Sequence, residues 1–225
     1  MVPLLLAALL WVGLHVGVAG TPLRGRIVAR LGEGGFRAAF SLGSLAAIGW
    51  LIQAWRTAET TPLWSASGPL RWVLAFAMLP AFVLFACSLI GNPTAVGGGG
   101  LLARGPRGIQ RVTRHPMLWS FAIWAAVHIL GNGDTAAIAF FGAFLVTALA
   151  GMPSIDAKMA ARQPEAWPGF AVASSVLPFG AIVAGRNTLS VREIGWVAPL
   201  AGTILWAALL HGHPHLMGVP VLIPG

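Results

Sequence analysis

The sequence predicts an all-α fold, a polytopic transmembrane helix bundle of about six spans with both termini outside the cytoplasm. The 225 residues are 57% hydrophobic and only 9% charged, whereas a soluble domain carries about 25% charged residues. The apolar residues occur in runs of about twenty, the length that an α-helix needs to cross a bilayer. Basic residues collect in alternate loops. We therefore expect one integral membrane domain over residues 1–225.

Six apolar runs are separated by polar or by glycine- and proline-rich segments. The first run has no basic residue before it and so lacks the basic region of a secretory signal, and we expect a retained helix. Thr113 and Pro116 suit the start of the fourth span. Gly131-Asn132-Gly133-Asp134 predicts a tight turn after it. The expected spans are residues 2–19, 36–55, 69–90, 116–131, 135–150 and 194–210.

The longest connection between two spans covers residues 151–193 and is amphiphilic. Its segment 170–184 is moderately apolar but is interrupted by a proline, so we expect an interfacial or re-entrant segment rather than a span. Asp156 and Arg162 are interpreted as surface charges. The glycines 97–100 are expected to form a loop, because no Gly-Lys-Ser/Thr follows them as in a phosphate-binding loop.

The distribution of basic residues gives the topology. The net charge is +8, and the chain has one lysine, Lys158. Loops after spans one, three and five each carry four basic residues, whereas the loop after span two carries two and the turn after span four none. The positive-inside rule then places both termini outside. We expect the arginines to face anionic lipid headgroups and not nucleic acid, because no basic stretch is interleaved with exposed aromatic residues.

The most informative stretch joins a cluster of arginines, Arg111 and Arg114, to His115 and, within the next span, His128. Titratable groups are costly in hydrocarbon and mark function there, and imidazole is the usual nitrogen ligand of haem iron or a divalent metal. His115 and His128 lie thirteen residues apart on one helix, roughly 20 Å, and cannot share one iron. His15, in the first span, can pair with either. Depth in the membrane fits the pairing with His115 better, but a haem lying obliquely allows the pairing with His128, so both pairings stay open.

Other candidate residues give weaker signals. His211 and His215 are four residues apart and could face one way, but Pro214 interrupts that helix. Cys87 is the single cysteine and lies in an apolar run, so we expect a packed small hydrophobic residue and no internal disulfide. No Cys-x-x-Cys-His segment exists to attach haem covalently.

Four segments match a known pattern: LHVGVAGTPLRGRIVARLGEGGFRAAFSLGSL, RVTRHPMLWSFAIWAAVHILGNGD, SSVLPFGAIVAGR and the terminal HPHLMG. Together they resemble the NnrU family of bacterial membrane proteins, whose plant branch is the cis-ζ-carotene isomerase. The resemblance implies a haem b iron held by His15 and His128, which would be both metal ligands and catalytic residues. His115, Arg114 and Arg111 are further candidates for cofactor binding. The plant enzyme has a cysteine three residues before the second ligand, where Ala125 stands here.

The resemblance implies a haem-binding protein of the bacterial inner membrane, either isomerase-like or redox-active, with a polyene or another apolar small molecule as its substrate. Haem would carry the chemistry, and the protein would orient the substrate and exclude water. One alternative is a non-enzymatic factor that supports nitrogen-oxide respiration as the partner of a membrane complex. The other is an enzyme like the isoprenylcysteine methyltransferases, which share an Arg-His-Pro-Met segment but have tyrosines that this chain lacks.

Overall fold

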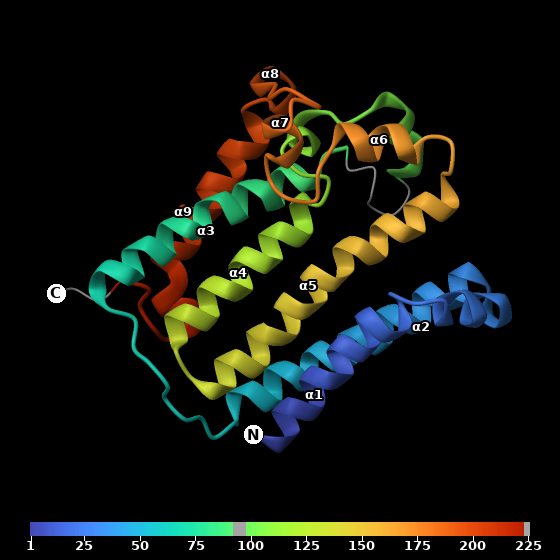
Figure 1. Cartoon of the computed structure of the whole chain (residues 1–225). Coiled ribbons are helices and arrows are strands. Elements are labelled where there is room, and N and C mark those ends of the chain that lie inside the picture. The colour runs from blue at the N-terminus through green and yellow to red at the C-terminus, as the bar shows by residue number, and fades with distance from the viewer. Residues whose placement is uncertain (92–97, 223–225) are drawn as a thin grey trace. The chain divides into compact units, whose positions relative to one another are not determined.

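The computed structural model describes residues 1–91 and 98–222, and its regular secondary structure over these ranges is helical, which confirms the all-α prediction. The only strand-like pairing in the described part is one isolated bridge between Pro62 and Asp134. The helices are α1 Val2–Val12, η1 Gly13–Val18, α2 Leu23–Arg56, α3 Gly68–Ser88, η2 Gly98–Arg104, η3 Gly108–Arg111, α4 Pro116–Asn132, α5 Thr135–Arg162, α6 Trp167–Ala173, α7 Gly180–Val183, α8 Val191–Ile194 and α9 Val197–Met217 (Figure 1).

Each of the six predicted spans coincides with a long helix or, at the N-terminus, with α1 and η1 together. By length and apolar composition, three helices among the described residues can cross a membrane, namely α2, α3 and α5. This is fewer than the six predicted. The apolar helix Val2–Val18 is shorter than a full span, and α4 has 17 residues. The segment 170–184 forms parts of the short helices α6 and α7 and no span, as expected.

The chain divides into two compact units, Met1–Ala66 with Ala125–Ser154 and Ser67–Trp124 with Ile155–Gly225. In the first unit α1 runs beside α2, which is kinked at Gly32 (φ +72°) (Figure 1). In the second unit α3 packs along α9 (Figure 1). Their backbones meet at Gly202, where a Cβ atom would lie 2.7 Å from the Phe82 carbonyl oxygen. A single membrane domain over the whole chain stays a prediction.

The tight turn predicted between the fourth and fifth spans is confirmed. Gly133 has φ +69°, and a Cβ atom there would lie 2.1 Å from the Trp64 carbonyl oxygen, so only glycine fits. Asp134 is the turn residue expected, since its Oδ1 accepts hydrogen bonds from the Ala137 amide (2.7 Å) and the Thr60 hydroxyl (2.8 Å). The carboxylate thus caps the start of α5.

Two other predictions fall at the end of α3 and in the loop after it. Cys87 is buried in an apolar cluster with Leu84, Ile109, Val112 and Ala198, as expected of a packed hydrophobic residue. Of the four glycines predicted to form a loop, Gly97 lies outside the described residues. The other three form the first turn of η2, so the loop prediction is wrong for them.

Candidate functional site

His15 lies in η1, a π-helical segment that continues α1. The wider hydrogen-bond spacing is visible where the Ala19 amide donates to the Leu14 carbonyl oxygen at 2.9 Å. Single π-helical turns occur frequently at functional sites. The His15 Nδ1 atom lies 2.9 Å from the Trp11 carbonyl oxygen. Because a carbonyl only accepts, Nδ1 carries the proton and Nε2 keeps its lone pair for a ligand.

Aromatic rings surround the His15 side chain. Its imidazole centroid lies 3.9 Å from the Trp11 ring and 5.2 Å from the Phe40 ring. Trp11 in turn contacts Phe144 of α5 at 5.0 Å. His15 is half-buried, and its immediate neighbours in this unit are therefore apolar rings rather than charged groups.

His128 belongs to the same unit and stacks on Phe141 of α5, with ring centroids 4.8 Å apart. Phe140 lies 5.0 Å from Phe141 and 5.3 Å from Phe144. We call Phe140, Phe141 and Phe144 the aromatic ladder of α5. His128 contacts this ladder directly, and His15 reaches it through Trp11. The two predicted ligands are thus connected to the same run of aromatic rings within one unit.

The position one helical turn before His128 is occupied by Ala125, which is fully buried. The described residues contain no group of three or more His, Cys, Asp or Glu side chains that could hold a metal ion.

The third predicted histidine, His115, belongs to the second unit and forms a buried cluster with Arg114 and Asp156. His115 Nε2 lies 2.8 Å from Asp156 Oδ1, and Arg114 Nη2 donates to Asp156 Oδ2 at 2.6 Å. The side chain of His115 is 1% exposed and that of Asp156 is 18% exposed. The interpretation of Asp156 as a surface charge is therefore wrong. The carboxylate faces two donors and is largely shielded from solvent.

Backbone contacts fix the position of the Asp156 cluster. The Thr113 hydroxyl donates to the Val176 carbonyl oxygen at 2.8 Å, and its Oγ1 accepts from the His115 amide at 3.2 Å. The Arg114 amide donates to the Ser175 carbonyl oxygen. His115 Nδ1 is buried and has no hydrogen-bond partner among the described residues. Thr113 thus supports the start of α4, although it bonds ahead of the helix rather than within its first turn.

Arg111 is held by a second carboxylate, Glu193, in the same unit. Its Nε and Nη2 atoms donate to the two carboxylate oxygens at 2.7 and 2.9 Å, a bidentate geometry that favours specific pairing. The Gly108 amide also donates to Glu193 at 3.0 Å. The hydrogen bonds from Arg111 and Gly108 lower the pKa of Glu193 from 4.5 to about 2. Arg111 and Arg114, both predicted to bind a cofactor, are thus each paired with a protein carboxylate.

We expect the Glu193→Gln variant to unfold at a lower temperature than the wild type at pH 7, by about 2 °C for an exposed pair. The folded-state pKa is below the usual value, so this stabilisation is present above about pH 4.5 and is lost as the pH falls toward 2. Thermal unfolding in detergent at pH 7 and at stepwise lower pH measures the difference. Glu165→Gln, at an exposed position, serves as the control. A difference that persists unchanged at low pH contradicts the assignment.

Sequence reasoning missed Asp156 and Glu193. The chain has 6 acidic residues against 14 basic ones, so an acidic residue near an arginine-rich loop has an unusual chance of pairing. Asp156 also follows the fifth predicted span closely, where an isolated carboxylate is costly. The small number of acidic residues and the position of Asp156 just after a predicted span could have indicated these ion pairs.

The comparisons with known proteins agree with the resemblance seen in the sequence. The family model described as NnrU protein matches residues 3–221. The chloroplastic 15-cis-zeta-carotene isomerase of Zea mays is 30% identical over 120 residues, which are 52% of this chain and 33% of that protein. The Arabidopsis thaliana protein of the same name is 32% identical over 114 residues, 49% of this chain and 31% of that protein.

The aligned part spans about a third of the length of these curated relatives. No solved structure matches the chain. The family model, in contrast, extends over nearly every residue, from the first turn of α1 to beyond the end of α9, and includes both His15 and His128. The chain therefore belongs to the NnrU family.

Proposed function

We propose that this chain is a haem-binding membrane protein that isomerises a double bond in a carotenoid-like polyene. The observation that carries the proposal is that His15 and His128 belong to one unit and are both connected to the aromatic ladder of α5, His128 through Phe141 and His15 through Trp11. Membership of the NnrU family and the similarity to proteins named 15-cis-zeta-carotene isomerase supply the substrate class.

The chemistry of these side chains fits haem b. A histidine that ligates a metal usually donates its other ring N–H to a carbonyl or carboxylate oxygen, and the Nδ1 of His15 does so toward the Trp11 carbonyl. His15 and His128 would hold the iron. The flat apolar rings beside them are suitable neighbours for a porphyrin. When bound, haem supplies a one-electron redox centre that can lower the order of a conjugated double bond.

The chain's own residues orient the polyene and exclude water. The rings in contact with the two histidines are phenyl and indole groups: Trp11, Phe40 and Phe141. They offer dispersion contacts to a conjugated chain and carry no carboxylate or ammonium. Cis–trans isomerisation changes neither the atoms nor the protons of the substrate, so it needs no general acid or base. The composition of this surface therefore suits the reaction.

We further infer six membrane crossings with both termini outside the cytoplasm, in a bacterial inner membrane. Three helices meet the length and composition requirement. The alternation of basic loops supports a crossing at each of the other three, α1 with η1, α4 and α9. The curated relatives, in contrast, are named as chloroplastic.

The test of the proposed function is an absorption spectrum of the full chain purified in detergent, oxidised and then reduced, followed by an isomerase assay. We expect a Soret band, one haem b per chain by pyridine haemochrome, and conversion of 15-cis-ζ-carotene measured by chromatography. Protein that stays colourless after addition of haemin overturns the proposal. Colourless protein that binds S-adenosylmethionine, or that co-purifies with a nitrogen-oxide-reducing complex, favours the corresponding alternative.

A further inference from the structure

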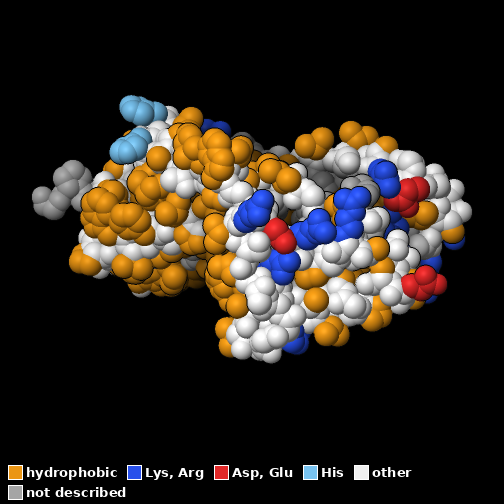
Figure 2. Space-filling view, turned by 90° about the horizontal axis from the view of Figure 1, so that it is seen from above, with side chains coloured by type: hydrophobic (Ala, Val, Ile, Leu, Met, Phe, Trp, Pro, Cys, Tyr) orange, Lys and Arg blue, Asp and Glu red, His pale blue; other side chains and the backbone are white. Residues whose placement is uncertain are grey.

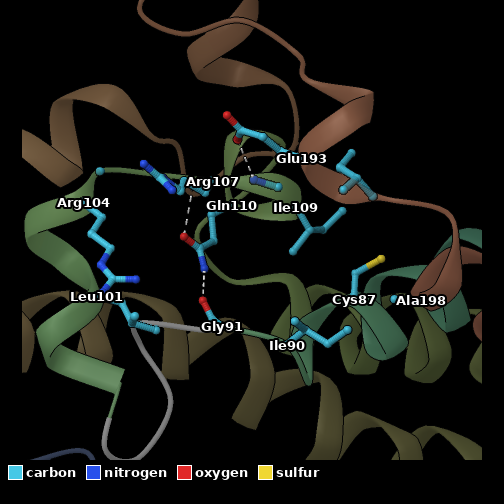
Figure 3. Close-up of a pocket in the computed structure, with 13 residues that line it drawn as sticks. Cys87, Ile90, Gly91, Leu101, Arg104, Arg107, Ile109, Gln110, Glu193 and Ala198 are labelled. Atoms are coloured by element: carbon cyan, nitrogen blue, oxygen red, sulfur yellow. Dashed lines mark hydrogen bonds between the residues drawn. The ribbon is translucent and has the colours of Figure 1, made fainter.

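A cavity of about 240 Å³ lies in the second unit, at the end of α3, whereas both histidines of the proposed haem site belong to the first unit. Its apolar part includes Ile90, Ile109 and Ala198, and its polar part includes Arg104 and Arg107 (Figure 3). We call it the Arg104–Arg107 pocket. One side of this pocket suits hydrocarbon and the other suits an anion.

The wall of this pocket is held by hydrogen bonds. The buried Gln110 side chain donates to the Gly91 carbonyl oxygen and accepts from the Arg107 amide (Figure 3). Gln110 is 5% exposed. Gln110 therefore joins the segment after α3 to the segment that carries Arg107. These hydrogen bonds fix the position of Gly91 relative to Arg107.

The pocket keeps two positive charges. Its one carboxylate, Glu193, already accepts hydrogen bonds from Arg111 and the Gly108 amide. Arg104 and Arg107 form no ion pair with any residue that the structure describes, although the charge of Arg107 contributes to the lowered pKa of Glu193. The view from above shows basic side chains gathered near the middle of the molecule, with an acidic side chain among them (Figure 2). An anionic ligand would complement the pocket.

The pocket also opens where a membrane-spanning helix ends. The helix α3 is apolar along its length and ends at Ser88. The next two residues, Leu89 and Ile90, are 64% and 66% exposed, and Ile90 lines the pocket. Exposed apolar residues at the end of a span lie near lipid tails, and arginines just beyond them lie near headgroups. A ligand that contacts both the apolar residues and the arginines must be amphiphilic, with an apolar chain and an anionic group.

We propose that the Arg104–Arg107 pocket binds the headgroup of an anionic phospholipid. The phosphodiester accepts hydrogen bonds from the Arg104 and Arg107 guanidinium groups, which suit planar two-point contacts with phosphate. One acyl chain passes along Leu89 and Ile90. A free phosphate shares the anionic chemistry but not the need for these apolar residues.

The experiment measures lipid binding to the purified full chain by native mass spectrometry, with phosphatidylglycerol and phosphatidylcholine of equal chain length. The test variant is Arg104→Gln/Arg107→Gln. The matched control is Arg26→Gln/Arg30→Gln, which removes the same charge from two exposed arginines of α2. We expect the wild type and the control to prefer phosphatidylglycerol about tenfold, and the test variant to lose this preference.

Two further measurements distinguish a phospholipid from a free phosphate as the ligand of the pocket. Ile90→Ser, at an exposed position, should weaken binding of long-chain phosphatidylglycerol but not of a short-chain analogue. Inorganic phosphate at millimolar concentration should not displace the lipid. The proposal is overturned if the control variant loses as much preference as the test variant, if the test variant keeps it, or if free phosphate competes equally well. Unchanged melting temperatures establish that all variants are folded.

Discussion

The His15→Ala variant should lose nearly all of the haem that the wild type retains. His15 supplies one of the two proposed axial nitrogens, and its ring is already oriented by the 2.9 Å contact with the Trp11 carbonyl oxygen. Alanine has no nitrogen atom that can ligate the iron, so the Soret absorbance per chain should fall at least about tenfold. This fall corresponds to a loss of about 1.4 kcal/mol or more in the free energy of haem binding. The measurement is the haem-to-protein ratio after purification and after reconstitution with haemin.

The control for this prediction is His211→Ala, at an exposed position in the other unit, which should retain full absorbance. Added imidazole should restore part of the band to His15→Ala if the lost group acted as a ligand. His128→Ala should behave like His15→Ala. Full absorbance in both single variants, with unchanged helix content by circular dichroism, would exclude these histidines as ligands.

The Asp156→Ala variant should be the most destabilised of the single variants considered. It leaves the guanidinium of Arg114 and the ring of His115 without their carboxylate, in a site where His115 is 1% exposed. Removing one partner of a buried ion pair costs about 3 kcal/mol, which corresponds to roughly 10 °C in melting temperature for a chain of this size. Differential scanning fluorimetry in detergent measures the shift.

Asp156→Asn separates the contribution of charge from that of hydrogen bonding, because the amide oxygen can still accept a hydrogen bond from His115 Nε2. We expect a smaller loss than for Asp156→Ala. Glu165→Ala, which changes an exposed carboxylate, should shift the melting temperature by less than about 2 °C. Equal melting temperatures for Asp156→Ala and the wild type would show that the cluster contributes nothing to stability.

The features predicted correctly from the sequence are those encoded by neighbouring residues. Apolar runs of sufficient length predicted the positions of the helices, Gly133 and Asp134 predicted the turn before α5, and the apolar surroundings of Cys87 predicted its burial. Each of these follows from local backbone preference or from hydropathy. Hydropathy alone did not predict that, within residues 1–91 and 98–222, three helices meet the requirement for a span.

The features that were missed depend on residues far apart in the chain. His115 and Asp156 are separated by 41 positions and Arg111 and Glu193 by 82, and no local pattern relates them. The extent of α2 was also missed. This helix begins at Leu23, well before the apolar run that starts at residue 36, and it is kinked at Gly32. Glycine disfavours the helix interior, and the segment 23–35 is rich in glycine and arginine, so neither helix propensity nor hydropathy predicted a helix there.

The π-helical turn Gly13–Val18 has a consequence for how this site tolerates change. Each residue of an α-helix advances the rotation by about 100°. A π-helical turn contains one residue more than an α-helical turn. Removing one residue can therefore restore an α-helical turn, whereas adding one would rotate Trp11 and the residues before it by about 100° relative to the residues after the turn. Gly13 and Gly17 have open space around them and should accept alanine. The direction in which the side chains of α1 point around the helix axis thus depends more on the number of residues in this turn than on their identity.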